Sequence, residues 1–134
     1  MNKGRTLAIL ALAAAGAFPL AMLMAQSAPK PFTVIESGRS FARLQDAVHA
    51  VGNARATIRI QPGTYRQCAV QTAGVITYIA DTPGTVTLAG QACEGKAALV
   101  LRGTGAEVRG LTFADIRVPD GNGAGIRLER GALN

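Results

Sequence analysis

Residues 75–90 have the sequence VITYIADTPGTVTLAG, in which two short β-branched runs stand on either side of a Pro-Gly turn. The same alternation of short apolar runs with Gly, Pro, Asp and Asn turns extends in both directions, from residue 57 to residue 128. Many short strands with no helix between them predict an all-β fold. The expected strands are residues 57–61, 75–80, 85–88, 98–101, 108–113 and 125–128.

A sandwich, a barrel and a solenoid are the all-β architectures to compare. Counted from Ile60, similar apolar strand centres recur at Ile79, Leu101 and Ile126. Their mean spacing of roughly 22 residues lies within the range of stacked-repeat proteins. Two-residue hairpin turns, which a sandwich often contains, are not evident. The spacing therefore favours a solenoid, in which each coil packs on the next.

One helix is expected ahead of this region. Its apolar face is formed by four residues at helical spacing, Phe41, Leu44, Val48 and Val51. Ser40 is the expected N-cap and Gly52 marks the expected end. The predicted helix covers residues 41–51, and a short strand at residues 32–35 precedes it. His49 lies beside the apolar face, which indicates an exposed helix residue rather than a ligand or a catalytic base.

Residues 1–25 have the pattern of a secretory signal peptide. Lys3 and Arg5 precede an uncharged stretch rich in Leu and Ala. Ala25 and Ser27 have the small-x-small spacing of a cleavage site, so we expect cleavage after one of them. The alternative is an uncleaved anchor, because the apolar stretch is long enough to span a bilayer. Either interpretation places the rest of the chain outside the cytoplasm, in the periplasm or the extracellular space.

The charges of the exported part argue against nucleic-acid binding. Without Lys3 and Arg5, the chain has 12 basic and 8 acidic residues, a net charge of +4 with no basic run. A surface that neutralises a row of phosphates needs such a run or stripe. The remaining length, a little over 100 residues, suits one small domain.

The two cysteines, Cys68 and Cys93, are expected to form a disulfide, because pairing is favoured in an oxidising compartment. Their separation in the sequence is close to one repeat, so they are expected on adjacent coils. A zinc site is disfavoured, because the single histidine, His49, does not complete a recognised ligand spacing with them.

Several stretches of the exported part carry a family resemblance. Residues 41–48, FARLQDAV, match an x-x-L-Q-x-A-V helix, and residues 57–65, TIRIQPGTY, match a strand that ends in P-G-x-Y. Residues 108–115, VRGLTFAD, are similar to a V-x-G-L-T-F-x-N strand, and residues 123–126, GAGI, to the G-x-G-I start of a coil. From residue 33 to residue 134, the chain resembles the N-terminal portion of the pectin-lyase-like superfamily.

The resemblance implies a right-handed parallel β-helix whose first coil is capped by the amphipathic helix. It divides the chain into a signal peptide (1–25), a linker with a first short strand (26–39), and N-terminal coils (40–134). Tyr65, after the Pro-Gly turn, is expected to pack at a coil corner rather than to bind substrate. No closing helix or polar cap is evident near the C-terminal residues, so we expect these coils to be the front part of a longer protein.

The superfamily includes pectate lyases, pectin methylesterases, other polysaccharide-cleaving enzymes and proteins without catalysis, so the resemblance specifies function only broadly. We expect an exported carbohydrate-active protein whose partner is an acidic polysaccharide. As an enzyme it would be a lyase, an esterase or a hydrolase. The first alternative is a non-catalytic surface or periplasmic module for binding or structure. A weaker one is a secreted fragment with its own role. Membrane contact is expected only through an uncleaved signal segment.

The resemblance also points to Asp115, Arg117 and Asp120. Lyases of the superfamily use Asp-bound calcium with a basic residue, and its esterases use an Asp pair and an Arg. Asp115 and Arg117 are two residues apart, which on a strand places them on one face, and they are the candidate catalytic pair. Asp120, in a Gly-rich loop with Asn122, is the candidate calcium ligand. The alternative for both aspartates is an ordinary turn role. The chain alone is expected to cleave no glycan, because such a site needs groups from several coils.

Overall fold

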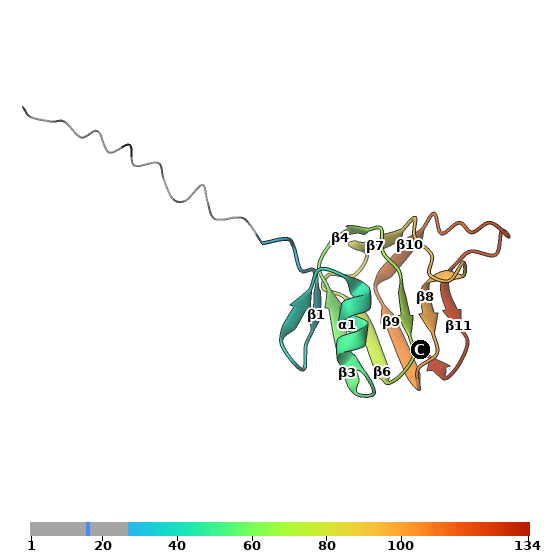
Figure 1. The fold of residues 1–134 in the computed structure, drawn as a ribbon, viewed down its shortest axis with the longest axis horizontal. Helices are drawn as coiled ribbons and strands as arrows, with labels where there is room; N and C mark the ends of the chain where they lie inside the picture. Colours follow the sequence, from blue (N-terminus) through green and yellow to red (C-terminus); the bar gives the residue numbers. More distant parts are fainter. Residues whose placement is uncertain (1–15, 17–26) are drawn as a thin grey trace, which may run out of the picture.

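The computed structural model describes residue 16 and residues 27–134 (Figure 1). Lys3, Arg5 and Ala25, on which the predicted signal peptide depends, lie outside the described residues. No helix in the described part is long and apolar enough to cross a bilayer. This part is mostly strand with one short helix, which confirms the β-rich composition expected from the sequence.

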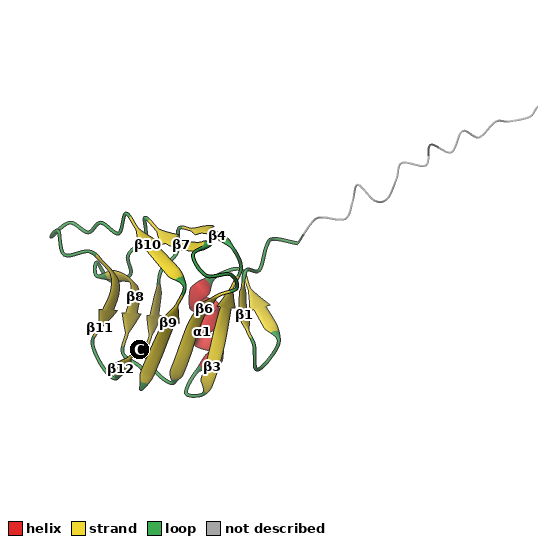
Figure 2. Ribbon diagram, turned by 180° about the vertical axis from the view of Figure 1, so that it is seen from behind, coloured by secondary structure: helices red, strands yellow, loops and turns green. Residues whose placement is uncertain are grey.

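The described residues form twelve strands and one helix, α1 (Leu44–Val51). Figure 1 and Figure 2 show their arrangement from opposite sides. Two short strands precede α1, and they are β1 (Phe32–Val34) and β2 (Arg39–Phe41). The strands after α1 are β3 (Arg55–Ile60), β4 (Gly63–Tyr65), β5 (Ala69–Gln71), β6 (Val75–Ala80), β7 (Val86–Ala89), β8 (Ala97–Leu101), β9 (Gly105–Arg109), β10 (Leu111–Ala114), β11 (Ala124–Leu128) and β12 (Ala132–Leu133).

The strands after α1 belong to three sheets that the chain visits in a fixed order. The first sheet contains β3, β6, β9 and β12, the second β4, β7 and β10, and the third β5, β8 and β11. The chain therefore passes through all three sheets before it returns to the first. Each strand lies parallel to the strand of the preceding circuit, which confirms the predicted parallel pairing. The described strands form no closed barrel.

The N-terminal end of the first sheet is antiparallel, which the sequence did not predict. β1 pairs with β3 on one side and with β2 on the other, so that Phe32 lies opposite both Ile60 and Phe41. The helix α1 contacts β1, β2, β3 and β5 at this same end. Four α1 side chains are buried there, and they are Leu44, Ala47, Val48 and Val51. This end of the core is therefore covered.

The helix begins later than predicted, because Phe41 and the expected N-cap, Ser40, belong to β2. Phe41 pairs with Phe32, and the hydroxyl groups of Ser40 and Thr33 are 2.7 Å apart in a hydrogen bond. Both positions are held by strand pairing, so they are not free to start a helix. The cap predicted from the local pattern was wrong because a tertiary contact took its place.

A distant side chain supplies the cap instead. Arg43 occupies the N-cap position without a capping bond from its side chain. Leu44 N donates a hydrogen bond of 2.7 Å to Oε1 of Gln67, and Gln67 lies 23 positions further along the chain. His49 is exposed on α1, as predicted.

The strand centres used to estimate the repeat do not form one column. Ile60 and Ile79 lie in the first sheet, whereas Leu101 and Ile126 lie in the third. The residues that face one another in the first sheet are Ile58, Tyr78 and Val108. The step from Tyr78 to Val108 is longer than the step from Ile58 to Tyr78, because the connections after β6 and β7 are longer than those after β3 and β4. The predicted repeat therefore combined positions from two different sheets, although strands of successive circuits do pair.

The apolar run at residues 108–113 was predicted as one strand but forms parts of two. β9 ends at Arg109 and β10 begins at Leu111, in a different sheet. Gly110 makes the corner with φ of +69°, a conformation that favours glycine. In the sequence, this corner is marked only by Gly110 and by a shift of the apolar alternation from Val108 to Leu111.

The core lies between the three sheets and contains one buried polar side chain among the described residues, Gln71. Tyr78 Oη donates to Gln71 Oε1 at 3.0 Å, and Gln71 Nε2 donates to the Gly105 carbonyl at 2.9 Å. The network joins β5 and β6 to the start of β9. Buried polar groups destabilise a core unless they are hydrogen bonded, so this network makes Gln71 compatible with burial.

The turns that lead into the strands of the first sheet stack closely, beginning with the turn from α1 into β3. A Cβ on Gly74 would lie 2.5 Å from the Ala54 carbonyl oxygen, and a Cβ on Gly131 would overlap the Gly103 carbonyl of the circuit before it. Both glycines have positive φ, +69° and +80°. The repeated contact shows that corresponding turns of successive circuits touch through their backbones.

Candidate functional site

The connections from the second sheet to the third form one edge of the molecule. They are residues 66–68, 90–96 and 115–123. Three hollows of about 330, 310 and 650 Å³ are lined by these connections and their neighbours. Asp115 lines the 310 Å³ hollow and Asp120 the 650 Å³ hollow, so the structure does not gather the predicted site residues into one place.

Asp115 and Arg117 lie in the connection after β10, not on a strand. Asp115 has φ of +53°, the left-handed conformation that turn aspartates adopt more readily than most residues. The prediction that a strand places both side chains on one face was therefore wrong. Arg117 Nη2 lies 3.8 Å from Asp115 Oδ1, and the side chains are 89% and 74% exposed. Exposed ion pairs are well solvated, so this one is not a desolvated catalytic pair.

Asp120 makes a local turn. Its Oδ1 accepts a hydrogen bond of 2.9 Å from Asn122 N, and this bond holds the pKa of the Asp120 carboxyl below its usual value. Among residues 27–134, no three His, Cys, Asp or Glu side chains gather closely enough to hold a metal ion. A calcium ion at Asp120 would need its other oxygens from the turn backbone, from Asn122 or from water.

Tyr65 packs as a corner aromatic. Its ring centroid lies 5.1 Å from that of Phe32, and Tyr65 Oη donates to the Gln61 carbonyl at 2.6 Å. Burial raises the pKa of Tyr65. The half-buried ring is held from both ends, which fits packing rather than a sugar-binding platform.

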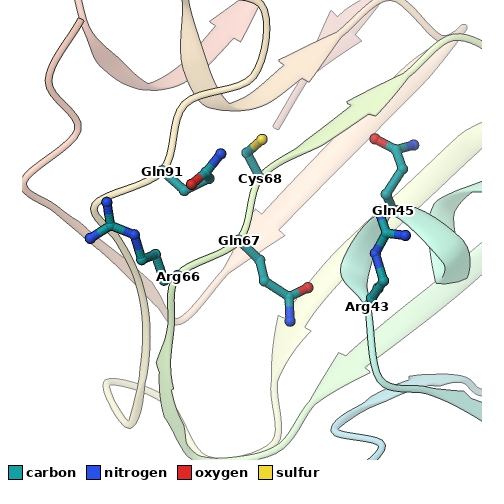
Figure 3. Close-up of a pocket in the computed structure, with 6 residues that line it drawn as sticks. All are labelled: Arg43, Gln45, Arg66, Gln67, Cys68 and Gln91. Atoms are coloured by element: carbon teal, nitrogen blue, oxygen red, sulfur yellow. The ribbon is translucent and has the colours of Figure 1, made fainter.

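The 330 Å³ hollow lies between the start of α1 and the connections that follow β4 and β7 (Figure 3). Figure 3 shows Arg43 on one side and Arg66 with Gln91 on the other, with Gln67 between them. The hollow is lined by Arg43, Gln45, Arg66, Gln67, Cys68 and Gln91. These side chains are all neutral or cationic, so the arrangement suits an anionic ligand.

Two of these glutamines build the wall of the hollow. Gln67 bonds to Leu44 N through Oε1 and to the Ala42 carbonyl through Nε2, at 2.7 and 3.1 Å. Gln45 bonds to both the N–H and the carbonyl of Val70, at 2.7 and 2.9 Å. These bonds fasten the start of α1 to β5 and to the segment before it. The wall is therefore held in place by two amide groups that are already hydrogen bonded to the backbone.

Cys68 and Cys93 form a disulfide, as predicted, with Cα atoms 5.5 Å apart. The bond joins the connection after β4 to the connection after β7, which belong to adjacent circuits. It therefore holds together the two segments that carry Arg66 and Gln91. A disulfide is compatible with an oxidising, exported location.

Little in the sequence points to the hollow. Arg43 and Arg66 are separated by a helix, two strands and the turns between them, and they belong to no spacing motif. Only the expected stacking of the helix on the first coil could have placed them near one another. Comparisons with protein-family models, with curated proteins and with solved structures found no match.

Proposed function

We propose that this chain is the exported N-terminal part of a right-handed parallel β-helix protein related to the pectin-lyase-like superfamily, and that it binds acidic polysaccharide. The order of the three sheets supports the coil architecture, since each circuit adds one parallel strand to each sheet. The close stacking of Gly74 and Gly131 on the preceding turns is consistent with it. The disulfide and the signal-like first residues support export.

The observation that carries acidic-glycan binding is the 330 Å³ hollow, which two arginines line without any carboxylate. It lies on the edge where three successive connections stack, and such an edge offers a long surface to an extended polymer. The arginines supply the charge that a uronic acid residue needs, and the amide of Gln91 suits one of its hydroxyl groups. The ligand is therefore proposed to lie across the connections rather than along one strand.

We propose that residues 27–134 bind without cleaving. Lyase chemistry needs the sugar carboxylate neutralised while a base removes the neighbouring proton. The Asp115–Arg117 pair is exposed and its members face each other, and Asp120 is engaged in its own turn. This arrangement favours a non-catalytic module, or a parent protein whose catalytic groups come from further coils.

Support for further coils comes from the end opposite α1. Leu128 and Leu133 are 43% and 36% exposed, although each belongs to a strand that pairs with the previous circuit. Another coil stacked on β10, β11 and β12 would cover them and pair these edge strands. We therefore propose that this end packs against additional coils of the same protein.

Affinity electrophoresis tests the proposed function. The full chain is run through native gels that contain polygalacturonate, alginate or neutral dextran, with and without calcium. Retardation is expected in the acidic gels and none in dextran. Parallel incubations are assayed for unsaturated sugars and for methanol from methylated pectin, and neither is expected. Equal mobility in all gels would refute acidic-glycan binding, and products lost on Asp115→Ala or Arg117→Ala would refute the non-catalytic assignment.

A further inference from the structure

We propose that the 330 Å³ hollow is a binding site for a single oxyanion group, the carboxylate of one acidic sugar, held by Arg43 and Arg66 with Gln91 as an additional donor. The identity of the ligand rests on the proposed function, whereas the existence of an anion site rests on the structure of the hollow alone. The site differs from the residues that the sequence singled out.

The two arginines are free to bind a ligand. Neither Arg43 nor Arg66 lies within 4.0 Å of a carboxylate among the described residues. The carboxylates that are paired with other cations are Asp81, Glu94, Glu107, Asp115 and Glu129. Of these, Asp115 shares the 310 Å³ hollow with Arg66, but its only cation within 4.0 Å in residues 27–134 is Arg117, and it does not line the 330 Å³ hollow. Positive charge at the 330 Å³ hollow is therefore not cancelled by an ion pair of the described residues.

The remaining acidic groups do not neutralise the hollow either. Glu36 is occupied at Thr57 N, and Asp120 at Asn122 N. Asp46 is the acid nearest to Arg43 in the sequence, but it lies on α1 and does not line the hollow. An incoming anion would thus meet two cations without displacing an internal partner, which makes binding less costly.

The arginines are presented by fixed segments. Arg66 lies over Gly90, where a Cβ would come 3.1 Å from Nη1 of the guanidinium. The disulfide from Cys68 to Cys93 ties the segment of Arg66 to the connection that carries Gln91. Arg43 directly precedes α1, which Gln67 fastens through Leu44 N. Preorganised donors lose less entropy on binding, so the fixed backbone favours an anion between them.

The chemistry of the lining favours a sugar carboxylate. A guanidinium presents paired N–H donors that match the two oxygens of a carboxylate. The amide of Gln91 supplies a donor and an acceptor for a hydroxyl group. The volume of about 330 Å³ lies at the lower end of the range for small-ligand pockets, about 300–1,000 Å³, and suits one sugar residue of a chain.

The test uses three variants of the hollow, which are Arg43→Gln, Arg66→Gln and the variant with both substitutions. Arg55→Gln is the control. Arg55 is an exposed arginine at the start of β3 that has no ion pair within 4.0 Å in residues 27–134 and does not line the hollow. Thermal unfolding first establishes that each variant is folded. Calorimetry then measures binding of trigalacturonate and of inorganic sulfate, and NMR follows the Gln91 side-chain amide.

We expect each single substitution at the hollow to weaken binding of trigalacturonate by at least about tenfold, because a charge-assisted hydrogen bond typically contributes about 1.5–3 kcal/mol and each 1.4 kcal/mol is about tenfold in affinity. Arg55→Gln should stay within about twofold of the unsubstituted chain, as expected for an exposed charge outside the site. The Gln91 amide signals should shift on titration in the unsubstituted chain and not in the double variant.

The outcomes separate the two proposals. If the unsubstituted chain binds trigalacturonate and the double variant binds it equally well, the site is refuted while acidic-glycan binding stands. If sulfate binds in an arginine-dependent way and trigalacturonate does not bind, the anion site stands and the glycan proposal fails. If neither ligand binds the unsubstituted chain, both are refuted.

Discussion

Cys68 and Cys93 are joined across two adjacent circuits of the chain, at the point where the connections after β4 and β7 lie side by side. The two residues are 25 positions apart in the sequence, so the bond closes a loop of moderate size. Such a loop restricts the unfolded chain, which in the chain-entropy model stabilises the folded state by about 3 kcal/mol. The Cys68→Ser, Cys93→Ser double variant should therefore lose about that much unfolding free energy in urea.

Thiol counting provides the control for this prediction. Denatured, unreduced protein from an oxidising compartment should give no free thiol, and reduced protein should give two. Two free thiols before reduction would show that the bond does not form.

The buried pair of Tyr78 and Gln71 predicts a difference between two tyrosine substitutions. Tyr78→Phe leaves Gln71 Oε1 buried without its donor, so it should lower the unfolding free energy by about 1–3 kcal/mol. Tyr65→Phe is the matched control, because the Tyr65 hydroxyl bonds to Gln61 in an exposed position and should cost less than about 1 kcal/mol. Urea unfolding of both variants measures the two losses of unfolding free energy. Equal losses would contradict the importance of the buried network.

Glu129 links Lys96 to Arg102, and this predicts a dependence of stability on pH. Hydrogen bonds from Lys96 and then from Arg102 hold the pKa of Glu129 below its ordinary value of 4.5. A carboxyl whose pKa is lowered by folding stabilises the protein above the ordinary value, and this contribution is lost as the pH falls through the folded-state pKa. The unfolding free energy should therefore decline below about pH 4.5.

The measurement is a series of urea unfolding curves between neutral pH and about pH 3, which covers the range in which carboxyl groups protonate. Glu129→Gln should make the decline shallower, and Lys96→Met should reproduce part of that change, since it removes one of the two partners. An unchanged slope in Glu129→Gln would contradict the assignment.

The stacked turns predict that substitution by alanine destabilises the protein to different extents at two glycines of similar backbone conformation. Gly74 and Gly84 both have positive φ, so Ala should strain the backbone at either site by about 1–2 kcal/mol. Only at Gly74 would the new Cβ meet backbone, 2.5 Å from the Ala54 carbonyl oxygen, whereas nothing lies within 4 Å at Gly84. Gly74→Ala should thus lower the melting temperature clearly more than Gly84→Ala, and equal shifts would speak against closely stacked turns.

Sequence patterns predicted the parts of the fold that depend on neighbouring residues. The run Val75–Ala80 is β6 with the same bounds, because its alternation of buried and half-buried side chains is encoded locally. β2 was missed because Phe41 fits a helix by spacing and a strand only through its pairing with Phe32. The register between circuits was missed because unequal connections separate the facing residues.

The candidate site was harder to predict for a related reason. Asp115 and Arg117 were selected by their spacing on an assumed strand, but β10 ends at Ala114 and Asp115 takes the left-handed conformation. Arg43 and Arg66 come together only because α1 packs beside the connection after β4. No local pattern identifies residues that meet through the packing of a helix beside a distant connection.

The negative charge of a polysaccharide is the feature that this chain is proposed to recognise. The most direct test is calorimetric titration of the full chain with trigalacturonate and with the same trisaccharide after its carboxyl groups have been reduced to alcohols. The two ligands share their linkages and ring hydroxyl groups and differ in charge. We predict binding of the acidic trisaccharide, weakened by added salt, and no measurable binding of the reduced one. Equal affinity for both ligands, or binding of neither, would contradict recognition of the charge.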